Sequence, residues 1–175
     1  MKKILFFIIT AGVLAMSCAK DEVGGTATQT VAGEWVVTVA AADANGTILY
    51  EDEDLYELGQ IKIFTYNTAK NVPTEMWIDD NEEFWEFKLV VNLDYGNATF
   101  STDDFVDNEY YNCGVKISNG KISFGAATTP SGMPADKIEF DIVFDDDSYV
   151  PAYWHHYYIS GYRYTGFAAD EPAGH

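Results

Sequence analysis

The sequence predicts an all-β fold, an antiparallel up-and-down β-barrel of about 8–10 strands. Runs in which apolar and polar residues alternate occupy most of the chain, as in strands with one buried face. Short turn-like segments separate these runs, and no long amphipathic helix is evident. The runs are rich in the 4 Trp, 12 Tyr and 11 Phe residues, and closing such strands into a barrel removes edges that would otherwise aggregate. A sandwich of two β-sheets is the alternative.

Four strands are expected in the first half of the chain. The apolar and β-branched residues predict them over residues 34–39, 61–66, 75–78 and 84–93. The last run alternates most clearly, with Trp85 and Phe87 on one face and Glu86 and Lys88 on the other. This two-residue period predicts a strand that buries one face in the core.

The second half continues the pattern, with a long aromatic strand at its end. Strands are expected over residues 98–101, 115–118, 121–124, 137–144 and 153–167. The Asn119–Gly120 pair predicts a type I′ hairpin turn, because both residues tolerate positive φ. Gly161 lies within the last run and indicates a bend or bulge there.

The N-terminus has the features of a secretory signal. A basic start and the short apolar run of residues 4–16 precede Ser17 and Cys18. Residues 14–18 resemble a bacterial lipobox, in which the cysteine is acylated and becomes the mature N-terminus. We therefore expect a signal peptide over 1–17, a lipidated tether over 18–30 with Cys18 as the membrane anchor, a barrel domain over 31–170 and a tail over 171–175.

The charged run of residues 19–22 resembles the export signal of surface lipoproteins in some Gram-negative bacteria. It implies an outer-membrane lipoprotein that faces the cell surface, with a periplasm-facing protein as the alternative.

Charge and cysteine content exclude several classes of function. The chain has 28 Asp and Glu residues against 10 Lys and Arg residues, a net charge of −18, so we expect no nucleic-acid partner. If Cys18 carries lipid, Cys113 has no disulfide partner and is expected to be a small buried apolar residue. The acidic clusters lack the spacing of a calcium loop. We therefore expect neither a metal site nor a cofactor.

Two residues resemble the closing pair of lipocalins. Gly33, Glu34 and Trp35 match the G-x-W with which lipocalin-like barrels begin. Arg163, the only arginine of the chain, occupies the last predicted strand, where lipocalins have an arginine that packs over this tryptophan. The resemblance implies a cation–π contact between Trp35 and Arg163 that closes the base of the barrel.

A wider resemblance extends over about residues 31–170. The chain is similar to bacterial lipoproteins known as the lipid-binding putative hydrolase family, which implies a calycin-type barrel with an apolar interior. The segments that carry this resemblance are the lipobox and residues 33–37, 65–68, 73–80, 84–88 and 160–163.

The leading hypothesis for function is binding of a small hydrophobic or lipid-like ligand inside the barrel. A barrel of about eight strands has room for one small ligand, and such sites are lined by aromatic residues. The candidate lining residues are Trp85, Phe87, Phe140, Tyr158 and Tyr162. The sequence leaves the oligomeric state open.

Two other functions remain as alternatives. An immunoglobulin-like sandwich would bind glycans through an exposed Trp77 or Trp154. A lipid or ester hydrolase would need His155 or His156 within hydrogen-bond reach of a Ser or Asp, but no catalytic motif accompanies them. Adjacent strand residues point to opposite faces, so we do not expect the two imidazoles to share a metal.

Overall fold

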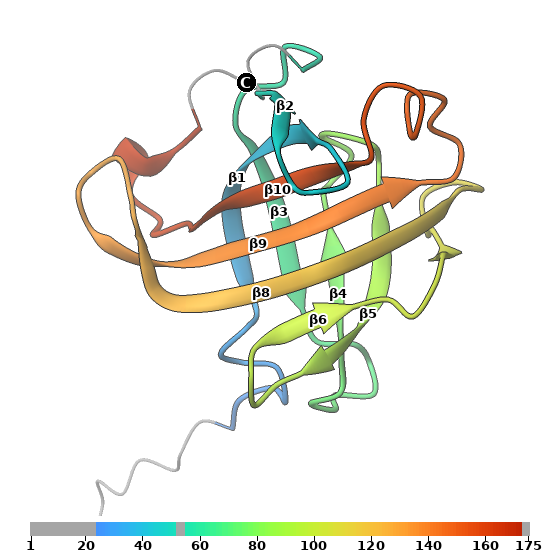
Figure 1. Cartoon of the computed structure of the whole chain (residues 1–175). Helices are drawn as coiled ribbons and strands as arrows, with labels where there is room; N and C mark the ends of the chain where they lie inside the picture. Colours follow the sequence, from blue (N-terminus) through green and yellow to red (C-terminus); the bar gives the residue numbers. More distant parts are fainter. Residues whose placement is uncertain (1–23, 52–54, 173–175) are drawn as a thin grey trace, which may run out of the picture.

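A computed structural model describes residues 24–51 and 55–172 (Figure 1). The predicted signal peptide and Cys18 lie outside the described residues, as does the end of the predicted tail. The described part contains ten strands and one 3₁₀ helix: β1 (Gly33–Ala42), β2 (Ile48–Tyr50), β3 (Ile61–Tyr66), β4 (Glu75–Asp79), β5 (Lys88–Asp94), β6 (Thr99–Ser101), β7 (Val106–Asp107), β8 (Gly114–Thr128), β9 (Pro134–Phe144), β10 (His156–Arg163) and η1 (Ala168–Asp170). Within these residues, no helix is long and apolar enough to cross a bilayer.

Eight of the described strands close into an antiparallel barrel. Around the barrel they follow the order β1, β3, β4, β5, β6, β8, β9 and β10, and β10 pairs again with β1. The short strands β2 and β7 attach to β1 and β8. Because β1 is hydrogen-bonded to a strand on each side, the structure confirms the barrel and excludes the sandwich.

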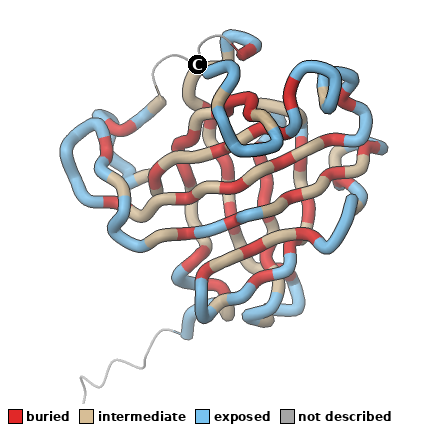
Figure 2. Tube along the Cα trace, viewed as in Figure 1, coloured by how far each residue is buried: buried red, intermediate tan, exposed pale blue. Residues whose placement is uncertain are grey.

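The inward faces of the strands form one apolar core. Buried and exposed positions alternate along the strands (Figure 2), as the two-residue period requires. Side chains from all around the barrel meet at its centre, and Trp35, Phe87 and Tyr157 each have 0% exposure. Within residues 24–51 and 55–172, side chains therefore pack the interior of the barrel, and no apolar hollow is found there.

The barrel has two different ends. The base is formed by the start of β1 and the ends of β3 and β10, where Gly33 pairs with Thr65 and Trp35 with Arg163. The mouth lies at the opposite end, where Ala42 at the end of β1 pairs with the first residue of β10. Four connections surround the mouth, and their described residues are 43–51 with 55–60, 80–87, 108–113 and 145–155.

One predicted strand is shorter than expected, because β5 begins only at Lys88. The Asp80 side chain is fully buried and accepts hydrogen bonds from the backbone N–H groups of Phe84, Trp85 and Phe87, among others. These bonds fold residues 80–87 into a compact connection, with positive φ at Asn81, Glu82 and Glu86. The alternating sequence pattern of residues 84–93 therefore begins in a loop. The backbone N–H groups of that loop donate hydrogen bonds to the Asp80 side chain rather than to a neighbouring strand.

The predicted hairpin turn at Asn119–Gly120 is wrong. Both residues lie within the continuous strand β8, and its pairing with β9 shifts between Ser118 and Lys121. An added Cβ at Gly120 would lie 2.4 Å from the carbonyl oxygen of Phe100. The tolerance of Asn and Gly for unusual backbone geometry here serves a bulge and a close strand contact. The last strand is also shorter than expected, over His156–Arg163.

Candidate functional site

Trp35 and Arg163 close the base. They occupy directly paired positions on β1 and β10, and Cζ of Arg163 lies 4.4 Å from the centroid of the Trp35 ring. The guanidinium also donates to the carbonyl oxygens of Thr30, at 2.8 Å, and Ala32, and to Oδ2 of Asp136 at 2.9 Å. A planar cation can stack and bond in several directions at once. Arg163 thereby ties the N-terminal segment across this end of the barrel.

The mouth is filled by aromatic rings. We define the mouth cluster as Tyr50, Tyr56, Phe84, Trp85, Phe144, Tyr149, Tyr153, Trp154 and Tyr157. Trp85 stacks on Phe144 with ring centroids 5.1 Å apart, and Trp154 stacks on Tyr149 at 5.3 Å. Tyr157 joins the two pairs, since its ring lies 5.8 Å from Trp85 and 5.7 Å from Trp154. These contacts make one continuous cluster.

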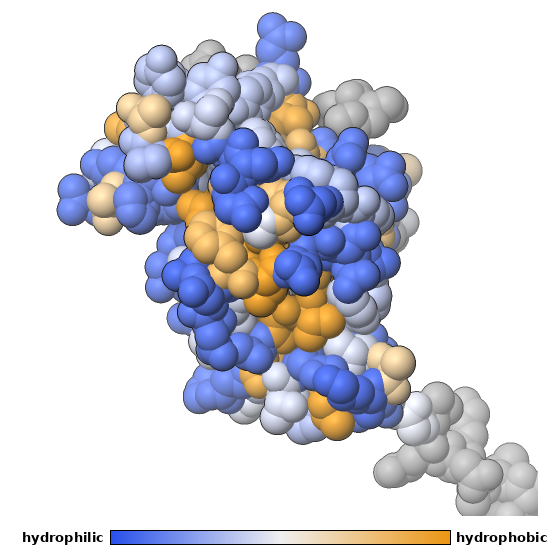
Figure 3. All heavy atoms as spheres, turned by 90° about the vertical axis from the view of Figure 1, so that its right-hand side faces the viewer, coloured by the Kyte–Doolittle hydropathy of each residue, from blue (hydrophilic) through white to orange (hydrophobic). Residues whose placement is uncertain are grey.

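The cluster grades from the core to the solvent. Tyr157 is completely buried and Trp154 is 8% exposed, whereas Tyr149 is 45% and Tyr153 66% exposed. Tyr50 and Tyr56 are also about half exposed. Apolar residues also reach the surface on the side of the molecule shown in Figure 3, with polar residues around them. The mouth thus presents large rings to solvent directly above the packed core.

Two carboxylates tie the mouth connections together. Asp146 accepts hydrogen bonds from Nε1 of Trp85 at 3.2 Å and from the Tyr111 hydroxyl at 3.0 Å. Burial alone would raise the pKa of Asp146, but the hydrogen bonds it accepts lower that pKa below its usual value. Asp147 accepts from the Tyr157 hydroxyl at 2.6 Å and from the backbone N–H of Tyr149 at 2.8 Å. Burial, helped by Asp147, raises the pKa of Tyr157, which stays a neutral donor.

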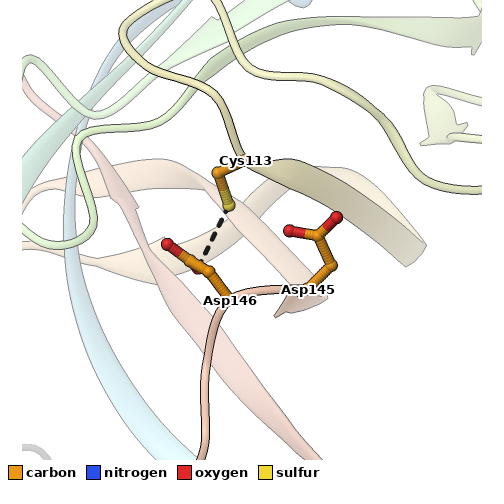
Figure 4. Close-up of side chains that lie close together, drawn as sticks. All are labelled: Cys113, Asp145 and Asp146. Atoms are coloured by element: carbon orange, nitrogen blue, oxygen red, sulfur yellow. Dashed lines mark hydrogen bonds between the residues drawn. The ribbon is translucent and has the colours of Figure 1, made fainter.

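Cys113 lies beside Asp145 and Asp146 under the same loops (Figure 4). Its Sγ and one carboxylate oxygen from each Asp lie within 4.8 Å of one another, a spacing that could hold a cation. The thiol donates to Oδ1 of Asp146 at 3.1 Å. Burial, with a further contribution from Asp146, raises the pKa of Cys113 to about 11. The thiol is therefore protonated at neutral pH, and a protonated thiol is a poor metal ligand.

The predicted lining residues lie in three different environments. Trp85 belongs to the mouth cluster, whereas Phe87 and Phe140 are buried side chains of the packed core. Tyr158 and Tyr162 lie on the outer face of β10, because Tyr157 and Ile159 point inward. The Tyr158 hydroxyl donates to Oε2 of Glu139 at 2.8 Å, and Tyr162 packs on Val36 and Ala135. These two tyrosines do not line the interior as the sequence analysis expected.

The two histidines lie in a groove of about 850 Å³ on the outside of the barrel. Their Nδ1 atoms are 3.2 Å apart, which contradicts the expectation that they point to opposite faces. His155 precedes β10, so strand alternation does not govern its direction. Nε2 of His156 lies 3.4 Å from Oδ1 of Asp141, and burial lowers the pKa of His156. No serine hydroxyl in residues 24–51 and 55–172 hydrogen-bonds to either imidazole, so a nucleophile–base pair is not assembled there.

Most residues of the mouth cluster were not predicted from the sequence. Tyr50, Tyr56, Tyr149 and Tyr153 were not candidates, and Trp154 was considered only for glycan binding. A usable signal was present, because residues 149–158 hold several aromatic residues directly after the acidic run 145–147. Their meeting depends on how three connections fold over one end of the barrel.

The chain was also compared with known protein families and with curated proteins. A family model described as lipid-binding putative hydrolase matches residues 20–168, which is most of the chain. A search of curated proteins found no match.

Proposed function

Because the chain belongs to the lipid-binding putative hydrolase family, we propose that the mouth cluster is the place where it binds a small hydrophobic or lipid-like ligand. The observation that carries the proposal is the unbroken run of rings from buried Tyr157 to the exposed rim of Tyr149 and Tyr153. The ligand chain would lie between rim rings, since the core below is already packed.

Burial of apolar surface is the driving force. A ligand that covers about 200 Å² of apolar ring surface gains about 5 kcal/mol before the cost of ordering the partners, at about 25 cal/mol per Å². Tyrosines suit such a rim, because their rings contribute area while their hydroxyls stay hydrated. The expected affinity is therefore modest and depends on chain length.

The proposal includes attachment of the protein to a membrane through Cys18. The lipobox-like residues 14–18 support lipidation, and the charged residues that follow support an outer-membrane lipoprotein that faces the cell surface. Residues 18–30 would then act as the tether between the membrane and the barrel. Such an anchor would hold the barrel close to a source of lipid-like ligands.

A titration with dodecyl maltoside below its micelle concentration tests the binding site. The combined variant Tyr149→Ser and Tyr153→Ser removes two rim rings that are 45% and 66% exposed and lie outside the buried core, so the fold should persist. We expect binding to weaken about tenfold, equivalent to about 1.4 kcal/mol.

The control variant is Phe124→Ser, which removes a ring that is 58% exposed and lies outside the mouth cluster. Maltose alone serves as the control for the sugar head. Absence of binding to the wild type, equal weakening by Phe124→Ser, or equal binding of maltose would each contradict the proposed function.

A further inference from the structure

Charge is distributed unevenly between the mouth and the rest of the chain. The described residues of the four mouth connections, 43–51 with 55–60, 80–87, 108–113 and 145–155, contain 11 of the 28 Asp and Glu residues. They contain none of the 10 Lys and Arg residues. Lys88 and Lys116 lie near the starts of the strands that follow two of these connections, and each pairs with a carboxylate outside them, Asp79 and Asp104. The electrostatic potential at the mouth is therefore negative, and it attracts cations and repels anions.

A buried donor without a partner lies among the mouth rings. Trp154 is 8% exposed, and its Nε1 is inaccessible to solvent and has no hydrogen-bond partner among the residues that the structure describes. Its ring is stacked against Tyr149 and lies 6.4 Å from Tyr153. A buried N–H without an acceptor costs about 1–3 kcal/mol. A ligand oxygen beside the Trp154 ring would supply the missing acceptor.

We propose that the mouth selects amphiphiles that combine an ammonium group with an acyl carbonyl, and that it rejects fatty-acid anions. This inference rests on the proposed function. The ammonium group would lie over the rim rings, where aromatic faces and nearby carboxylates both stabilise a cation. The carbonyl oxygen would accept from Nε1 of Trp154, and the chain would pack between the rings.

The mouth would repel a fatty-acid carboxylate rather than attract it. It would approach Asp146 and Asp147, which already hold the loops together, and no lysine or arginine from the mouth connections could neutralise it. Like charges in a partly desolvated site repel strongly. Hydrophobic contact alone would then have to overcome this repulsion.

Four twelve-carbon probes below their micelle concentrations test the inference: dodecanoylcholine, dodecyltrimethylammonium, dodecanoate and dodecyl maltoside. We expect dodecanoylcholine to bind at least tenfold more tightly than dodecanoate. Raising the salt concentration should reduce this difference in affinity, because salt screens the interaction between the ligand charge and the carboxylates. The variant Glu51→Gln with Glu57→Gln should reduce the difference as well.

Trp154→Phe tests the role of the orphan donor, because it keeps a ring and removes Nε1. We expect dodecanoylcholine to lose its advantage over dodecyltrimethylammonium in this variant, while the apo protein unfolds at the same or a higher temperature. An unchanged advantage would refute the role of Trp154.

The outcomes separate the inference from the proposed function. If dodecanoate binds as tightly as dodecanoylcholine while dodecyl maltoside also binds, charge selection is wrong and the binding site stands. If none of the four probes binds, both are wrong.

Discussion

At the scale of single residues, the side chain of Arg163 makes four contacts at the base of the barrel. It stacks on Trp35, donates to Thr30 and Ala32, and pairs with Asp136. Making all four at once requires the flat, multi-donor guanidinium. Arg163 therefore locks the base of the barrel in a way that no other described cation does.

Arg163→Lys should lower the free energy of unfolding by about 1–3 kcal/mol, because the charge remains while stacking and most donors are lost. Urea denaturation measures the effect. Lys70→Met is the control, since Lys70 forms an exposed pair with Glu75 that contributes little. A loss for Arg163→Lys no larger than the loss for the control would show that the base does not depend on the guanidinium.

The sequence predicted the pairing of Trp35 and Arg163, because each is chemically distinctive and sits in a terminal strand of a barrel. Because side chains alternate along a strand, the inward direction of Tyr157 also means that Tyr158 points outward. The sequence alone did not show which of the two sets of alternating residues in β10 faces the interior. The rim tyrosines could not be predicted in this way, since no strand periodicity governs loop residues.

At the scale of elements, the seam between β1 and β10 closes the barrel. The strands pair over their whole length, from Trp35 with Arg163 to Ala42 with His156. At Gly161 they approach so closely that an added Cβ would lie 1.9 Å from the carbonyl oxygen of Val36. The bulge predicted at Gly161 is wrong, because its pairing with β1 and with β9 continues without a shift, and the glycine instead permits a close contact between backbones.

Gly161→Ala should therefore lower the free energy of unfolding by about 3 kcal/mol or more, because backbone atoms have to move. Gly96→Ala is the matched control, since its Cβ would meet only Oδ1 of Asp94 at an ordinary 3.6 Å. Comparable stability of the two variants in thermal or urea unfolding would count against this seam geometry.

Connections were harder to predict than strands, for a physical reason. The run 84–93 alternates like a strand, yet Asp80 accepts hydrogen bonds from the backbone of Phe84, Trp85 and Phe87. The rings of Phe84 and Trp85 then join the mouth cluster. Likewise, the Asn119–Gly120 pair is typical of a hairpin turn but lies in a bulge of β8. Both local predictions were wrong, because tertiary partners outweighed the local preference.

At the scale of the whole molecule, the barrel has a locked base, a packed centre and an aromatic, acidic mouth. The closed ring of strands was predictable from periodicity, and the packed centre was not, because the sequence does not show how many aromatic side chains point inward. The packed centre moves the proposed ligand from the interior to the mouth. Function then depends on the connections, where loops carry the binding residues on a rigid scaffold.

The most direct test of the mouth as the binding site uses dodecyl maltoside with a brominated chain, since bromine quenches nearby tryptophan fluorescence. The account predicts quenching in the wild type that is largely lost when Trp85→Phe and Trp154→Phe are combined. That variant retains Trp35 at the base and Trp77 on β4. If quenching persists in this double variant and disappears only when Trp35 is also replaced, the brominated alkyl chain lies inside the barrel. That result would contradict the mouth as the binding site.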